Sequence, residues 1–140
     1  MTSPEMDDRE TFENVFYYFL TSLRVLASDA ASQCEAMGNH NTPWEIQRDM
    51  VSGGLGSLRL SARTLNWEQA EKILDIVAAV RRLPREAIAV PNMSMTSHVG
   101  CVAAMSHPAW EPLRREAAAL LVFLEPAIQA NTAYIHRKAK

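Results

Sequence analysis

Eight consecutive apolar residues, from Ala117 to Leu124, constrain the fold more than any other feature of the sequence. Eight successive positions of a helix cover every side of its cylinder, and a helix that is apolar all round must be buried all round. The run falls well short of the roughly 20 residues that a bilayer-spanning helix needs. We therefore expect a helix over 108–137 that forms the enclosed centre of an α-helical domain. Pro126 should kink this helix, because proline lacks a backbone N–H.

A second long helix is predicted over residues 4–37. Between Phe12 and Met37, apolar residues recur at alternating spacings of four and three, and Gln33 is the polar exception in the series. This heptad spacing is typical of a helix that packs one face against another helix. We expect that packing to occur within the chain, against the helix over 108–137. A coiled coil between two chains is the alternative.

Three shorter helices complete the expected bundle, and they cover residues 43–51, 67–82 and 96–105. Thr42 and Asn66 each stand three residues before a Glu or a Gln, the arrangement of a capping box at a helix start. The glycine-rich stretch 52–56 should end the first of these helices, because a helical glycine costs about 1 kcal/mol relative to alanine. Trp67 and Leu74 fall on the apolar face of the second. The prediction is a single all-α domain, residues 1–140, built as a bundle of about four to six helices.

The composition is that of an ordinary soluble domain, with 48% apolar residues, 21% charged residues and a formal net charge of −2. This charge disfavours nucleic acid or an anionic membrane as a partner. Cys34 and Cys101 form no metal or redox motif, and we expect two buried free thiols. The acidic N-terminal residues differ from those of a signal peptide, so a cytoplasmic protein is expected. Arginine outnumbers lysine, which is typical of GC-rich bacterial genomes.

No catalytic motif is recognised in the sequence, and no cofactor is expected. His98, Cys101 and His107 are weak candidates for metal ligands, because their residue types suit zinc. Only His98 and Cys101 have a spacing that would bring them to one face of a helix. The favoured interpretation is therefore an exposed His98, a buried Cys101 and a His107 that lies in a loop or caps a helix.

The residues singled out for partner binding are aromatic, basic or methionine side chains, which dominate or adapt to protein interfaces. They are Tyr17, Tyr18, Trp44, Arg81, Arg82, Arg85, Met93, Met95 and Trp110. The alternative for the tryptophans is a place at the edge of the core, with the indole N–H hydrogen-bonded. The alternative for the arginines is to complement the negative end of a helix dipole. The irregular segment 84–107 is the first place where a binding surface is expected.

Two functional hypotheses of different classes follow. The first is a non-enzymatic module that binds a partner protein, as bacterial inhibitors and toxin-immunity proteins do. This hypothesis rests on class membership and not on a motif. The second is a helical domain that holds a small ligand or a metal, with or without enzymatic activity, in a pocket near Pro126 and His98–His107. A homodimer is an open alternative for the partner, whose identity the sequence does not give.

Overall fold

The computed structural model describes residues 8–60 and 64–139, and it describes their side chains as far as Thr132. Every regular element in these ranges is an α-helix, which confirms the all-α prediction, although there are eight helices and not four to six. The helices are α1 (Asp8–Ala27), α2 (Ala30–Ala36), α3 (Thr42–Arg59), α4 (Trp67–Arg81), α5 (Arg85–Ile88), α6 (His98–Met105), α7 (Trp110–Phe123) and α8 (Glu125–Ala139).

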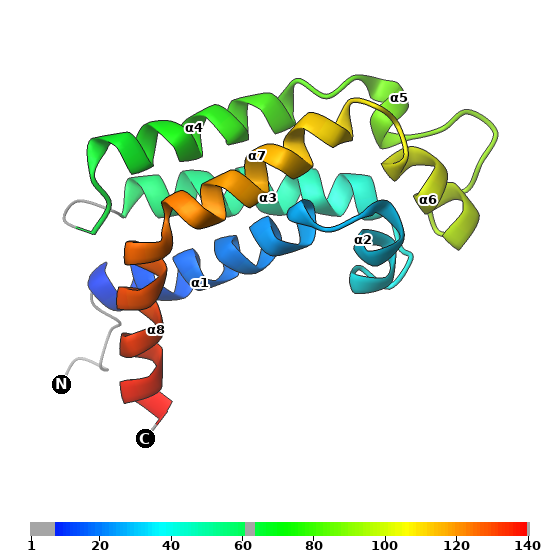
Figure 1. Cartoon of the computed structure of the whole chain (residues 1–140). Helices are drawn as coiled ribbons and strands as arrows, with labels where there is room; N and C mark the ends of the chain where they lie inside the picture. Colours follow the sequence, from blue (N-terminus) through cyan, green and yellow to red (C-terminus); the bar gives the residue numbers. More distant parts are fainter. Residues whose placement is uncertain (1–7, 61–63, 140) are drawn as a thin grey trace, which may run out of the picture.

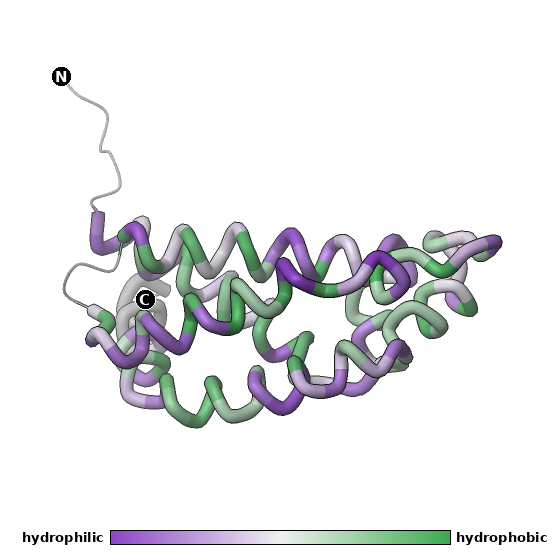
Figure 2. The backbone as a smooth tube through the Cα atoms, turned by 90° about the horizontal axis from the view of Figure 1, so that it is seen from above, coloured by the Kyte–Doolittle hydropathy of each residue, from purple (hydrophilic) through white to green (hydrophobic). Residues whose placement is uncertain are grey.

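Four helices, α1, α3, α4 and α7, lie side by side and enclose the core (Figure 1). α1 packs against α3 and α7, and α4 completes the ring by packing against the same two helices. The short helices α2, α5 and α6 gather at one end of the bundle, while α8 turns away at the other (Figure 1). Hydrophobic and hydrophilic stretches alternate along the long helices (Figure 2), as expected of helices that are buried on one side only.

The apolar face of α1 lies at the centre of this ring. Phe12, Phe16 and Phe19 are fully buried, and successive rings stack with centroids 5.2 and 6.4 Å apart. The predicted packing of the first long helix against the C-terminal part of the chain is confirmed by the contact between α1 and α7. α3 is the second neighbour of α1 in the ring.

The predicted single helix over 4–37 is wrong, because the structure breaks it at Ser28. α2 begins after Asp29, whose carboxylate accepts a hydrogen bond of 2.8 Å from the Ser32 backbone N–H. This hydrogen bond holds the pKa of Asp29 below its usual value. The break turns α2 so that Gln33 Nε2 donates to the Leu26 carbonyl oxygen at 2.8 Å. The predicted helix start at residue 4 lies outside the described residues.

α3 continues through the glycine-rich stretch, so the predicted helix end near residue 51 is wrong. Gly54 is buried where α3 meets α4, and a Cβ atom on it would lie 2.4 Å from Val77 Cγ2. Gly53 faces α1 in the same way, with its Cβ position 3.2 Å from Phe19 Cβ. The glycines therefore allow two neighbouring helices to approach closely. The packing gained there offsets the low helix propensity of glycine. The predicted helix end was based on that propensity only.

The predicted capping boxes have different outcomes. At α4, the Asn66 side chain accepts from the Gln69 N–H and the Gln69 side chain accepts from the Asn66 N–H, both at 2.8 Å. At α3, Thr42 is already helical, and the N-cap residue Asn41 makes no side-chain capping bond. The predicted helix over 96–105 begins two residues later, at His98, and the short helix α5 was not expected.

α7 is not buried all round, and this overturns the premise drawn from the apolar run. Leu120 and Leu124 face the core, whereas Ala119 is exposed and Val122 is 76% exposed. The reason is that α7 forms one side of a four-helix ring, in which α1 and α4 are its neighbours. An apolar helix can therefore leave a stripe of small and aliphatic side chains open to solvent.

The expected kink at Pro126 is a complete break between two helices. α7 ends at Phe123 and α8 begins at Glu125, so Pro126 occupies the first turn of α8. Proline is well tolerated there, because the first N–H groups of a helix have no partner within it. α8 turns aside at this point (Figure 1), and Val122 near the end of α7 is exposed.

Candidate functional site

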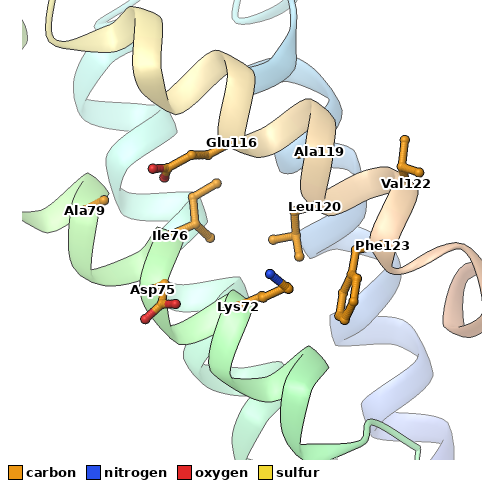
Figure 3. A pocket seen from close by; sticks show the side chains of 9 residues that line it. All are labelled: Lys72, Asp75, Ile76, Ala79, Glu116, Ala119, Leu120, Val122 and Phe123. Carbon is orange, nitrogen blue, oxygen red and sulfur yellow. The ribbon is translucent and has the colours of Figure 1, made fainter.

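An open groove of about 560 Å³ lies between α4 and α7 (Figure 3), and we call it the α4–α7 groove. Its volume falls within the range of about 300–1,000 Å³ that is usual for small-molecule sites. The lining residues are Lys72, Asp75, Ile76 and Ala79 of α4 and Glu116, Ala119, Leu120, Val122 and Phe123 of α7. The two helices run in opposite directions (Figure 1), so the Ala79 end of α4 lies beside the Glu116 end of α7.

Small side chains on both helices create this hollow. Ala79 and Ala119 line opposite walls, where longer side chains would reach across the gap. Ile76 and Leu120 lie beneath them, 2% and 5% exposed, and form an apolar floor. The groove thus lies where the exposed side of α7, with Ala119 and Val122, faces α4 but does not pack against it.

Three charged groups border the apolar floor. Lys72 Nζ lies 4.9 Å from the centre of the Phe123 ring, a cation–π contact at one end of the groove. Asp75 lies one helical turn before Ala79, and Glu116 lies on the opposite wall (Figure 3). Among the residues that the structure describes, neither carboxylate forms an ion pair. The lining of the groove therefore carries one excess negative charge.

A second exposed surface lies across α3 and α4, and we call it the α3–α4 face. It consists of Trp44, Arg48, Val51 and Leu55 on α3 and of Leu74, Ala78 and Arg81 on α4. On each helix these residues recur at spacings of three and four, so they form one stripe. A hollow of about 440 Å³ joins the two stripes, and its lining includes Trp44, Arg48, Val51 and Arg81.

The α3–α4 face combines exposed apolar side chains with arginines. Trp44, Leu55 and Leu74 are 43%, 39% and 51% exposed. The Arg48 guanidinium lies 4.8 Å from the centre of the Trp44 ring, and Arg48 also pairs with carboxylates of its own helix. Arg81 has no ion pair within the described ranges. Tryptophan and arginine are the residues most often found at the energetic centre of protein interfaces.

The structure brings together only some of the side chains that the sequence singled out for partner binding. Trp44 and Arg81 line the same hollow, although 36 positions of the chain separate them, from residue 45 to residue 80. Tyr17 and Tyr18 are exposed on α1 and contact each other edge to face, with ring centroids 5.4 Å apart. They form a separate surface, because α1 and α4 lie on opposite sides of the ring.

The remaining basic and methionine candidates gather around segment 84–107. Arg82, Arg85 and Met93 are exposed, so a partner could reach each of them. Met95 is half-buried, and its carbonyl oxygen accepts hydrogen bonds from the Asn41 N–H and the Cys101 thiol. Its backbone therefore has a structural role in holding this segment to the bundle.

Trp110 is a wrong choice for a surface contact. Its side chain is fully buried, and its indole N–H donates to the Ala87 carbonyl oxygen at 2.9 Å. This bond ties α7 to the short helix α5. Trp67, by contrast, is 85% exposed, and both Trp67 and Leu74 were expected on the inner face of their helix. The apolar side of α4 is therefore wider than the part of its surface that the other helices cover.

The three weak metal candidates make separate contacts. His98 is exposed, with Nδ1 2.7 Å from Asn39 Oδ1, and the buried Cys101 Sγ donates to the Met95 carbonyl oxygen at 2.9 Å. His107 lies between helices, where Nδ1 accepts from the Ala109 N–H at 3.0 Å. Three or more His, Cys, Asp or Glu side chains do not converge on a possible ion position anywhere in the described part of the chain.

Both cysteines are free and buried, as expected from the sequence. Burial, followed by the neighbouring Cys101, raises the pKa of the Cys34 thiol from 9.0 to about 11. A thiol held in its neutral form is a poor nucleophile. Cys34 therefore belongs to the packed core and is not a reactive group.

Comparison with known protein families, curated proteins and solved structures finds no match to this chain. None of the described helices is both long enough and apolar enough to cross a membrane. The α3–α4 face and the α4–α7 groove are therefore the two candidate binding sites. Leu55, Leu74 and the residues that line the groove are not among the candidates predicted from the sequence. A helical-wheel projection of α4 could have found Leu74, because it lies about 100° away from Ile73.

Proposed function

We propose that this protein is a non-enzymatic binding module whose α3–α4 face docks a partner protein. The observation that carries the proposal is the hollow shared by Trp44 and Arg81, with Leu55 and Leu74 exposed further along the same two helices. Two helices supply this surface, and their backbones are held together at Gly54. Such a preformed surface loses little conformational entropy when it binds, and this favours affinity.

The chemistry of the face defines the partner. The apolar side chains of Trp44, Leu55 and Leu74 suit the apolar side of an amphipathic helix. Arg81 carries an uncompensated positive charge beside them, so carboxylates at the edge of that helix would complete the contact. The proposed occupant is therefore an acidic amphipathic helix of another protein.

The test uses the full-length protein as bait in lysate of its native host. Leu74→Glu and Arg81→Glu change the α3–α4 face, and Val99→Glu is the matched control, because Val99 is 67% exposed on α6 and does not belong to that face. We expect one partner whose recovery falls at least about tenfold with each of the first two variants and stays unchanged with the control. The purified partner should carry an acidic helix and bind more weakly at high salt.

Two results would contradict the proposal. One is that every protein recovered by the wild type is recovered equally by Leu74→Glu. The other is that the specific partner lacks an acidic segment and binds independently of salt. The narrower hypothesis of an inhibitor or toxin-immunity protein has its own readout. In that case, the activity of the purified partner should be lost in the complex with the wild type and retained with Leu74→Glu.

A further inference from the structure

We propose that the α4–α7 groove binds a small organic cation, in which an ammonium group is joined to an apolar chain or ring. This site is distinct from the α3–α4 face, because it uses the opposite flank of α4. Lys72, Asp75 and Ala79 point to the groove, whereas Leu74 and Arg81 belong to the other flank.

The shape of the groove selects a small molecule. Its volume of about 560 Å³ suits a ligand of drug-like size. Lys72 and Phe123 contact each other at one end of the lining. A ligand lying along the groove would cover Ala119 and Val122, which are exposed to water, and burial of such apolar surface is favourable.

The charges of the groove select a cation. Asp75 and Glu116 lie on facing walls and form no ion pair within the described residues. Ile76 lies between the two carboxylates, and the small side chain of Ala79 beside them leaves the α4 wall open for an ammonium group (Figure 3). The positive charge of Lys72 lies at the other end, over the Phe123 ring. Low-dielectric walls strengthen the attraction of such a cleft for ions of opposite sign.

The same arrangement disfavours the other ligand classes. A carboxylate with an apolar chain would meet two negative groups and one lysine, so its charge would be repelled on balance. A neutral ligand would gain from the apolar floor and little from the charges. We therefore expect the affinity of the groove to be highest for the cation, lower for the neutral ligand and lowest for the anion.

A titration of the purified full-length protein with three eight-carbon probes tests this order. The probes are octylammonium, 1-octanol and octanoate, each kept below the concentration at which it aggregates, and backbone NMR shifts report where each binds. We expect octylammonium to shift the resonances of α4 and α7 around the groove and to bind at least about tenfold more tightly than octanoate. Equal or tighter binding of octanoate would overturn the proposal, as would shifts confined to another part of the protein.

Two variants separate the contributions of charge and shape. Asp75→Asn combined with Glu116→Gln should remove the preference for octylammonium over octanoate and leave the affinity for octanol unchanged. Ala119→Phe should fill the hollow and abolish binding of all three probes. All three substituted positions are exposed, so the fold should survive, and thermal unfolding checks it. Unchanged octylammonium affinity in either variant would overturn the proposal.

Further variants distinguish this site from other uses of the same surface. Leu74→Glu should not change the octylammonium affinity, so the groove and the docking of a partner protein can fail independently. Val99→Phe, an equally bulky change on α6, should also have no effect. If the wild type sediments as a dimer and Ala119→Phe as a monomer, the groove is an interface between two copies of the chain, and the small-molecule assignment is wrong.

Discussion

The Arg114 guanidinium donates two hydrogen bonds to the Gln33 side-chain oxygen, with Nη2 2.9 Å and Nε 3.3 Å from Oε1. Arg114 Nη2 also donates to the Met105 carbonyl oxygen at the end of α6. Gln33 is fully buried, and its amide nitrogen donates to the Leu26 carbonyl oxygen. These bonds connect α1, α2, α6 and α7, so the one polar residue in the heptad series of the first helices has a structural role.

Arg114→Ala should therefore destabilise the fold by about 2–3 kcal/mol. Hydrogen bonds to charged groups contribute roughly 1.5–3 kcal/mol, and a buried acceptor left without a donor costs a similar amount. Urea unfolding gives the free energy. The control is Arg115→Ala on the exposed side of the same helix, which should change it by less than about 0.5 kcal/mol. Equal effects of the two substitutions would refute a structural role for the Gln33 contact.

Gly54→Ala should destabilise the protein by about 1–3 kcal/mol, although alanine is the better helix former. The added Cβ would lie 2.4 Å from Val77 Cγ2, so α3 and α4 would have to move apart. In a Val77→Ala background the obstructing methyl group is absent. There the same change should be stabilising, by up to about 1 kcal/mol of helix propensity. A double-mutant cycle of thermal unfolding measures this reversal of sign.

The three tryptophans should differ in their accessibility to acrylamide. Trp67 is 85% exposed, Trp44 is 43% exposed and Trp110 is fully buried. Three variants that each retain one tryptophan, with the other two changed to phenylalanine, isolate the signals. We expect quenching to fall in the order Trp67, Trp44, Trp110, with the shortest emission wavelength for Trp110. A readily quenched Trp110 in a folded variant would contradict the packing of α7 against α5.

The stability of the protein should fall at alkaline pH through Cys34. The folded state raises the pKa of this thiol from 9.0 to about 11, so the neutral thiol is favoured by folding. Its contribution is fully present below pH 9.0, where the thiol is neutral in both states. It declines as the pH rises toward about 11, because unfolding then releases a proton.

Cys34→Ala is the comparison for this prediction, since it removes the titrating group and leaves every other ionisable side chain in place. The unfolding free energy of the wild type should exceed that of the variant by a constant amount below pH 9.0, and the difference should shrink above that pH. A difference that stays constant up to pH 11 would show that Cys34 ionises equally in both states. A thiol reagent at pH 8 should label the folded wild type slowly and the unfolded chain fast.

Local patterns were sufficient to predict an all-helical chain, because helix formation depends on residues three or four positions apart. Asn66 and Gln69 form the expected capping box, and the heptad series starting at Phe12 faces the core. The pattern did not reveal the break at Ser28, because a heptad series continues across a short turn. Gly54 was misjudged for a related reason. Its low helix propensity is a property of the residue, whereas its close contact with Val77 depends on a helix that comes later in the chain.

The positions of the candidate sites depended on the tertiary structure more than the positions of the helices did. The sequence determined that residues 117–124 are apolar and helical, and hence that most of α7 packs against something. It did not determine how much of the cylinder would be covered, because coverage depends on the number and position of neighbouring helices. With α1 and α4 as its neighbours in the four-helix ring, α7 leaves Ala119 and Val122 open to solvent. The groove beside α4 exists for that reason. Trp44 and Arg81 line one hollow because α3 and α4 pack side by side.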